Sequence, residues 1–170
     1  MSVGADPRPG SDEITVIDSA GATSIAEGRA VLRRLVEIAA DTGAGSTHRG
    51  APGAARTWLV LGELADESEV DRRVIDHDLL GRAAVRLAVD KIVCIGDSRP
   101  VRAAHQGAVM EGSWGDEANL VGTAEELALR WRDPGEPAPS GGDVIALVGG
   151  WDRTAVLAVL AERDLVVRRI

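Results

Sequence analysis

The stretch that decides the fold runs from Ile92 to Ser98 and reads IVCIGDS. Its first four residues are apolar without alternation, which is the pattern of a strand buried on both faces of a parallel sheet. Gly96 ends the run, and Asp97 or Ser98 can then cap the first turn of a helix. The stretch therefore predicts one strand–helix unit of a parallel α/β domain.

The same unit recurs along the chain. Further strands are predicted at Ile14–Asp18, Trp58–Gly62, Val144–Val148 and Leu165–Arg169, with a weaker one near Ala118–Val121. Further helices are predicted to begin at Ser24 (in a capping box with Glu27), Ser68, Thr123 and Asp152. Strand and helix thus alternate about five times, which predicts an open, doubly wound α/β domain with crossover helices on both faces of the sheet.

The rest of the chain predicts how this domain is bounded. Residues 1–12 are polar and rich in Gly, Pro and Asp, so we expect a flexible leader before a single domain at 13–170. Residues 43–55 and 133–142 are rich in Gly, Pro and Ser and are expected to be exposed loops.

Composition excludes several classes of function. The formal net charge is −8, from 19 basic and 27 acidic residues, and no basic stripe is present, so a nucleic-acid binder is not expected. No apolar stretch approaches the roughly 20 residues of a membrane span. Cys94 is the only cysteine, which favours a reducing cytoplasm. Lys91 is the only lysine, and it precedes a strand, so it cannot be the lysine of a P-loop.

Ligands of doubly wound sheets bind outside the carboxyl ends of the strands. Here those ends carry Asp18–Gly21, Gly62-Glu63, Gly96–Ser98 and Gly149–Asp152. One interpretation is a binding crevice, in which helix amino ends offer N–H groups to an anion. The alternative is that Asp and Ser only cap helices while Gly makes tight turns. The residues alone leave both interpretations open.

The chain lacks an evident catalytic constellation. No strand exit supplies a G-x-G-x-x-G fingerprint, and His48, His77 and His105 do not have the spacing of a metal site. His77 interrupts an apolar helical stripe, where a buried, hydrogen-bonded histidine is the simpler expectation. Cys94 lies in mid-strand and is expected to be a core residue. Trp114 and Trp151 are either exposed contact residues or covers of the core.

Several blocks now match a known family. Trp58–Glu63 (WLVLGE), Gly81–Gly115 and Gly142–Leu147 (GDVIAL) follow the order found in the C-terminal domain of the Mur ligase MurF. From about Ile14 to Leu160 the chain resembles that domain, most closely in actinobacterial members. The resemblance implies a Rossmann-like, mostly parallel six-stranded sheet with about five helices. It also implies a link to peptidoglycan synthesis, where MurF adds D-alanyl-D-alanine to the UDP-N-acetylmuramoyl tripeptide.

The chain departs from the family at its nucleotide-binding motifs. The family's first block is roughly V-I-D-D-x-Y-N-A-N-P-x-S, whereas Val16–Ile25 reads VIDSAGATSI. Of the polar residues only the first Asp carries over, as Asp18, and the Tyr, both Asn and the Pro are gone. The family's last strand ends in Lys-x-Ser, and here Val148-Gly149-Gly150 stands instead. His77 matches a histidine common at this place in the family. A complete ligase also needs an ATP-binding central domain and a UDP-sugar domain, and these residues supply neither.

The resemblance and its departures imply a stand-alone, non-catalytic domain, a pseudoenzyme, in the cytoplasm of an actinobacterium. We expect it to be a binding or regulatory module for peptidoglycan precursor synthesis, with no cofactor or metal and with a cell-wall biosynthesis protein as a partner. The alternative is one half of a split ATP-dependent amide ligase, which would use ATP and Mg²⁺ and a separate Mur-type central domain. A third hypothesis is an excised domain of a divergent ligase. The expected ligand-binding residues are Asp18, Ser19, Thr23, Ser24, Glu63, His77 and Asp97.

Overall fold

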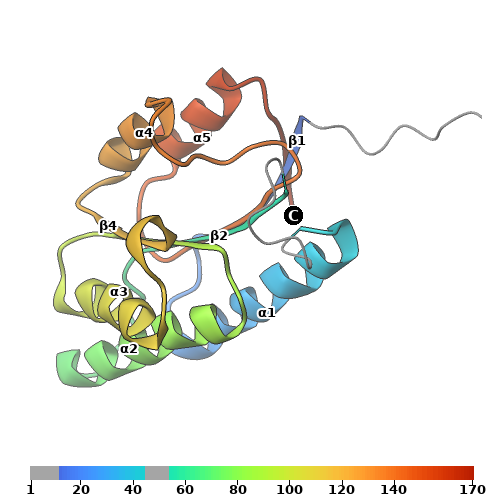
Figure 1. Cartoon of the computed structure of the whole chain (residues 1–170). Coiled ribbons are helices and arrows are strands. Elements are labelled where there is room, and N and C mark those ends of the chain that lie inside the picture. The colour runs from blue at the N-terminus through green and yellow to red at the C-terminus, as the bar shows by residue number, and fades with distance from the viewer. Residues whose placement is uncertain (1–11, 45–53) are drawn as a thin grey trace, which may run out of the picture.

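A single parallel sheet lies between two layers of helices in the computed structural model, which describes residues 12–44 and 54–170 (Figure 1). The strands are β1 (Glu13–Ser19), β2 (Thr57–Leu61), β3 (Lys91–Ile95), β4 (Ala118–Val121), β5 (Val144–Val148) and β6 (Val166–Arg169). Their order is β4-β3-β2-β5-β1-β6, and every neighbouring pair is parallel. The six strands predicted from apolar runs are confirmed, with ends that differ by about one residue.

The helices fall into two groups. They are α1 (Ile25–Thr42), α2 (Val70–Arg86), α3 (Arg99–Glu111), α4 (Ala124–Arg132) and α5 (Thr154–Glu162), with a 3-10 turn η1 at Gly115–Glu117. Helices α1, α2 and α3 cover one face of the sheet and α4 and α5 cover the other (Figure 1). The chain moves from β1 to β4 on the first face and returns to β5 and β6 on the second, as right-handed crossovers require. This confirms a doubly wound, Rossmann-like α/β fold.

Alternate residues of each strand enter opposite cores, because side chains of a strand point alternately to its two faces. On β2, Leu59 and Leu61 pack under α1–α3, whereas Trp58 and Val60 pack under α4 and α5. Trp58 meets Trp131 of α4 edge to face, with ring centroids 5.7 Å apart. The double burial explains why the strands are continuous apolar runs rather than alternating ones.

Three of the predicted helix caps are confirmed. Ser24 forms the capping box with Glu27, and Ser98 and Thr123 each accept a hydrogen bond from a backbone N–H of the first turn. Asp152 accepts from Thr154 N at 2.8 Å, but the N-cap of α5 is Arg153, so the helix begins one residue later than predicted.

The predicted cap of α2 was wrong. Glu69 occupies the N-cap position without a side-chain cap, and the Ser68 hydroxyl donates instead to the carboxylate of Asp66. The same carboxylate oxygen also accepts from Ser68 N at 3.0 Å, so Asp66 holds Ser68 in the turn that precedes α2. The ends of the predicted apolar stripe of α2 are also more exposed than expected, because Val70 and Leu87 retain 42% and 37% of their surface.

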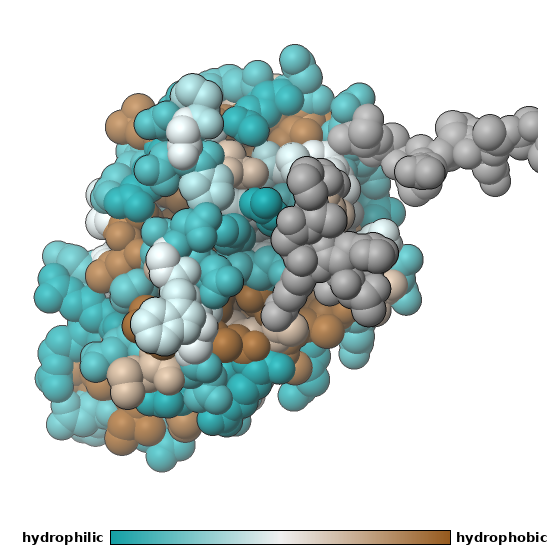
Figure 2. All heavy atoms as spheres, in the orientation of Figure 1, coloured by the Kyte–Doolittle hydropathy of each residue, from teal (hydrophilic) through white to brown (hydrophobic). Residues whose placement is uncertain are grey.

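The outer surface is mixed. Hydrophilic residues predominate on the face shown in Figure 2, with hydrophobic residues single or in small groups among them. No helix within 12–44 or 54–170 has the length and apolar character needed to cross a bilayer. The predicted leader at 1–12 lies almost wholly outside the described residues, and so does His48 of the predicted 43–55 loop.

Candidate functional site

The strand order creates a crevice at the carboxyl edge of the sheet. The chain leaving β2 and β3 turns to helices on one face, whereas the chain leaving β4 and β5 turns to helices on the other. Because neighbouring exits diverge at β3/β4 and at β2/β5, space is left between them. This is the place where a doubly wound sheet binds its ligands.

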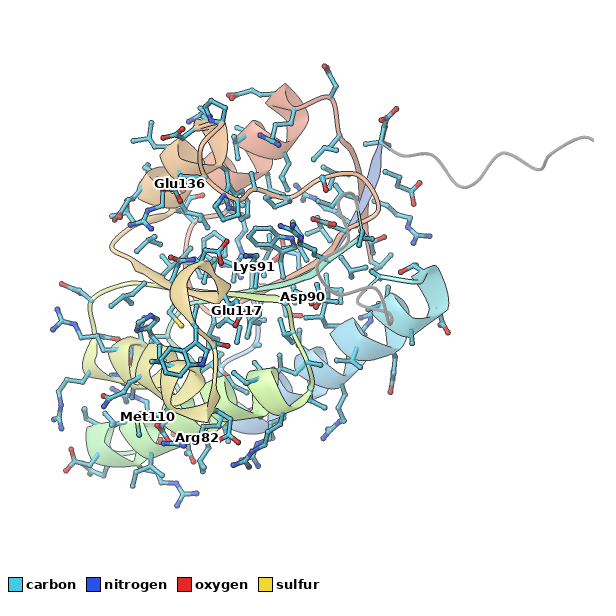
Figure 3. All side chains as sticks on the ribbon, in the orientation of Figure 1. Arg82, Asp90, Lys91, Met110, Glu117 and Glu136 are labelled. Atoms are coloured by element: carbon cyan, nitrogen blue, oxygen red, sulfur yellow. The ribbon has the colours of Figure 1, made fainter. Side chains whose placement is uncertain are left out.

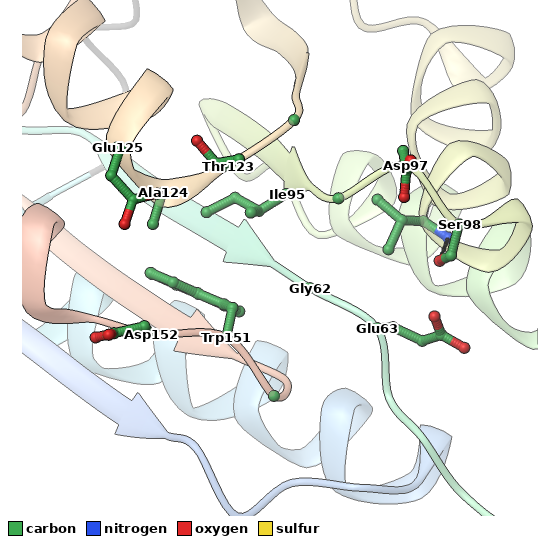
Figure 4. Close-up of a pocket in the computed structure, with 14 residues that line it drawn as sticks. Gly62, Glu63, Ile95, Asp97, Ser98, Thr123, Ala124, Glu125, Trp151 and Asp152 are labelled. Carbon is green, nitrogen blue, oxygen red and sulfur yellow. Dashed lines mark hydrogen bonds between the residues drawn. The ribbon is translucent and has the colours of Figure 1, made fainter.

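A pocket of about 330 Å³ occupies this crevice (Figure 4). Its walls come from the exits of β2, β3, β4 and β5 and from the first turns of α3 and α4. The Trp151 indole extends from the β5 exit towards Ala124, with Glu125 and Asp152 at one end of the pocket and Glu63, Asp97 and Ser98 at the other (Figure 4). The pocket therefore joins an aromatic wall to polar side chains at both ends.

The pocket is acidic. Four carboxylates line it, from Glu63, Asp97, Glu125 and Asp152, and among its described lining residues there is no Lys, Arg or His. Glu63 is partly compensated by Arg73 of α2, whose Nε lies 3.4 Å from Glu63 Oε1. The other three form no ion pair with any residue of the described ranges. A phosphate would meet like charge here, whereas an ammonium group would meet opposite charge.

The only lysine of the chain is far from this pocket. Lys91 is the first residue of β3, at the amino end of the strand, and its Nζ pairs with Asp116 Oδ2 at 2.8 Å (Figure 3). The pocket lies beyond the carboxyl end of the same strand. Lys91 therefore anchors the η1 turn, and no lysine is available to a phosphate in the pocket.

The polar groups at the helix starts are already used structurally. Ser98 Oγ accepts from Val101 N at 3.4 Å, and Thr123 Oγ1 accepts from Glu126 N at 3.1 Å. The hydrogen bonds of Thr154 hold the pKa of Asp152 below its usual range. Within 12–44 and 54–170, no three His, Cys, Asp or Glu side chains converge closely enough to hold a metal ion. The carboxylates therefore surround the pocket without forming a chelating cluster.

The structure brings together only part of the predicted ligand-binding set. Glu63 and Asp97 both line the pocket. Asp18 instead pairs with Arg153, with 3.2 Å between Oδ1 and Nε. Thr23 and Ser24 are engaged with Glu27 at the start of α1, and Ser19 accepts from Ala22 N in the turn before it. None of these last four lines the pocket described above.

His77 is enclosed in the protein interior, 1% exposed. Its Nε2 accepts from Leu64 N at 3.0 Å, so its Nδ1 carries the proton that is donated to Arg73 O at 2.8 Å. Burial lowers the pKa of His77 below its usual value near 6.5, although the Arg73 carbonyl opposes this shift. The neutral ring links the chain that leaves β2 to α2 by hydrogen bonds. This is the buried, hydrogen-bonded histidine that was the simpler expectation for this residue.

The His77 environment predicts a pH dependence of stability. Because its folded pKa is below its unfolded pKa, the unfolded state binds more protons as pH falls below about 6.5. Stability should therefore fall with decreasing pH, by up to about 1.4 kcal/mol per pH unit, until the folded pKa is reached. Urea unfolding between pH 5 and 7.5 measures this slope. His77→Gln should remove it and His105→Gln should keep it; equal slopes in wild type and His77→Gln would contradict the assignment.

Cys94 lies in mid-strand in the core, and burial raises the pKa of its thiol to about 12. The thiolate is the reactive form, so the native protein should not react with a disulfide reagent such as DTNB at pH 8. One equivalent should react after unfolding in denaturant. Rapid stoichiometric labelling of the native protein would show that the thiol is accessible.

Residues that were not among the expected ligand contacts supply most of the pocket lining. The stretch Gly149–Asp152 was recognised as a strand exit, but Trp151 and Asp152 were not among the expected ligand residues, and neither were Thr123 and Glu125. A usable signal was present, because α4 begins directly after the weakly predicted strand β4. The pairing of β4 with β3 brings that exit beside Asp97.

The comparisons with known proteins agree on one group. The chain is 43% identical over 122 residues to the UDP-N-acetylmuramoyl-tripeptide–D-alanyl-D-alanine ligase of Mycobacterium leprae, and 38% identical over 123 residues to those of Mycobacterium bovis and Mycobacterium tuberculosis. These matches cover 69% and 72% of the chain but 22% of each ligase, in its C-terminal part. The chain thus spans about a fifth of the length of the curated relatives it matches. No family model matches the chain, and no solved structure matches it with significance.

Proposed function

From the premise that the chain is a MurF C-terminal-like domain, we propose that it is a non-catalytic binding module in peptidoglycan precursor synthesis. The observation that carries the proposal is the pocket at the carboxyl edge of the sheet, which has an aromatic wall and four carboxylates. Its partner in the cell would be a protein of cell-wall biosynthesis. The domain contributes recognition, and another protein carries out the chemistry.

The side chains near the pocket support binding rather than catalysis. The two residue types that most often act as base or nucleophile are unsuited to it here: His77 is held by two backbone groups, and the Cys94 thiol is buried with a pKa of about 12. The lysine that a nucleotide phosphate would need lies at the opposite end of β3. The four carboxylates of the pocket can attract a cation and position it.

The charge of the pocket selects between the two substrates in the relatives' name. The UDP-muramoyl tripeptide carries the phosphates of its UDP group, whereas D-alanyl-D-alanine is a zwitterion with an ammonium at one end and a carboxylate at the other. The carboxylates of Asp97 and Glu125, which form no ion pair among the described residues, and that of Asp152, which has Arg153 as a charged neighbour, favour the ammonium of the dipeptide. Its carboxylate can meet the amino ends of α3 and α4, which carry positive partial charge. We therefore propose that the pocket takes the dipeptide or a peptide with the same end.

The alternative is one half of a split ligase. In that case a separate Mur-type central domain would bring ATP and Mg²⁺ over the open side of the pocket, and Glu63 and Asp97 would face the metal-bound nucleotide. What favours this alternative is the match to about a fifth of a larger ligase. It predicts measurable affinity for Mg-ATP, which the first proposal does not.

Calorimetric titration tests the two proposals. D-alanyl-D-alanine should bind with a dissociation constant at or below the millimolar range, N-acetylated dipeptide should not, and Mg-ATP should give no heat. Glu125→Gln should weaken dipeptide binding about fivefold. Glu136→Gln, remote from the pocket, is the matched control and should change nothing (Figure 3). Saturable Mg-ATP binding without dipeptide binding would support the split ligase, and equal binding of the acetylated dipeptide would refute recognition of the ammonium.

A further inference from the structure

Trp151 is held in place from several sides. Its Nε1 donates to Val148 O at 3.0 Å, and its Cδ1 rests on Gly62, where a Cβ atom would come within 2.5 Å of it. On one face of the ring lies the Arg153 guanidinium, with its central carbon 4.3 Å from the ring centroid. The ring also lines the pocket, so the side that faces away from Arg153 is the one left for a ligand.

Arg153 is an unusual neighbour for this ring, because its side chain is only 8% exposed. Its Nε pairs with Asp18 at 3.2 Å and its Nη1 donates to Trp151 O, but its Nη2 is buried without a partner among the described residues. Burying a guanidinium with an unpaired N–H costs free energy. Arg153 therefore lacks one hydrogen bond at Nη2 but stacks on the Trp151 ring.

Asp18 is connected to the pocket only through other residues. It lies one residue before the end of β1, in register with Leu147 of β5, and its carboxylate compensates the buried charge of Arg153. It is not a lining residue. Asp18 is thus connected to the pocket through Arg153 and Trp151, in that order. This chain of contacts gives a structural role to Asp18.

We infer that Trp151 is the ligand-contacting floor of the pocket and that Asp18, through Arg153, is a positioning residue that fixes this floor. The inference rests on the proposed function for the ligand class, a short peptide with a free ammonium group and small side chains. Arg153 already occupies one face of the indole, which lowers its attraction for a second cation. The ring therefore packs against the methyl groups and peptide plane of the ligand, while the surrounding carboxylates bind the ammonium.

The positioning role is tested by three variants and two readouts, the dipeptide dissociation constant and acrylamide quenching of tryptophan fluorescence. A Trp114→Phe background removes the most exposed tryptophan, so that Trp151 dominates quenching over the buried Trp58 and Trp131. Trp151→Ala should weaken dipeptide binding more than tenfold. Asp18→Asn and Arg153→Met should weaken it about fivefold and increase quenching. Asp78→Asn, whose carboxylate pairs with Arg82 away from the pocket, is the control.

The outcomes separate this inference from the proposed function. If wild type binds no dipeptide, the proposed ligand is wrong, but quenching of the free protein still tests whether Asp18 and Arg153 hold Trp151. Because Trp151→Ala can also disturb folding, Trp151→Phe is the second variant; it keeps a ring and should retain binding within about fivefold. Unchanged quenching in both Asp18→Asn and Arg153→Met would overturn the positioning role. Wild-type affinity for the dipeptide in Trp151→Ala would overturn the assignment of Trp151 as the ligand-contacting floor.

Discussion

Asp143→Ala is expected to lower the free energy of unfolding by about 3 kcal/mol, because it leaves three N–H donors without their acceptor. The Asp143 carboxylate is 1% exposed and accepts from Trp58 Nε1 and Arg56 N at 2.8 Å and from Ser140 N at 3.0 Å. Burial raises the pKa of this carboxyl, and the three donors oppose the shift. The carboxylate therefore joins the starts of β2 and β5 at the centre of the sheet. Urea unfolding measures the fall in the free energy of unfolding when it is removed.

A double-mutant cycle with Trp58→Phe isolates the buried part of this network. Trp58 is 2% exposed, so its indole N–H is buried together with Asp143, and the two substitutions should show a coupling of about 1 kcal/mol. Asp143→Asn should fall between wild type and Asp143→Ala, since the amide keeps one acceptor oxygen but turns an NH₂ group towards a donor. Asp133→Ala, at an exposed turn, should have little effect. Strict additivity in the cycle would mean that the Trp58–Asp143 bond adds no stability.

Gly81→Ala is expected to cost about 3 kcal/mol through overpacking. Helices α2 and α3 approach so closely that a Cβ atom at Gly81 would lie 2.0 Å from the backbone oxygen of Ala104. The obstacle is backbone, so it cannot rotate away as a side chain would. The two helices must move apart, and the packing on β3 moves with them. Thermal and urea unfolding measure the loss.

Gly28→Ala is the matched control, because Gly28 is also a buried helical glycine. Its added Cβ would meet only the flexible ends of Leu64 and Leu80, at 3.0 and 3.1 Å. The gain in helix propensity, about 1 kcal/mol, should offset this crowding. A Gly81→Ala protein as stable as wild type would mean that the helices α2 and α3 are less tightly packed than described.

The sequence predicted the fold well because each strand is buried on both faces. A run such as IVCIG at Ile92–Gly96 can satisfy its apolar side chains only between two helical layers. The caps at Ser24, Ser98 and Thr123 were equally local and therefore predictable. The prediction for Ser68 failed because Asp66, two residues before it, accepts from both its N–H and its hydroxyl and holds it in the preceding turn. Local pattern alone does not decide whether a serine joins such a turn or caps the helix.

The candidate site was predictable only in part, because it is made by strand order. Glu63 and Asp97 follow obvious strands and were placed correctly at the same edge. The parts played by Asp18 and Trp151 depend on β5 lying between β1 and β2, which brings Arg153 beside Asp18. No spacing in the sequence reports this insertion. The pairing of residues 135 positions apart follows from the topology, not from a motif.

The measurement that tests the central claim most directly is a ¹H–¹⁵N NMR titration with D-alanyl-D-alanine. The four tryptophans give four indole N–H signals. Our account predicts that the Trp151 signal and the backbone signals of Gly62, Ser98 and Thr123 shift on binding, while the buried Trp58 and Trp131 signals stay in place. A titration in which Trp151 and these backbone signals do not move, or in which only Trp114 responds, would contradict a peptide-binding pocket at the carboxyl edge of the sheet.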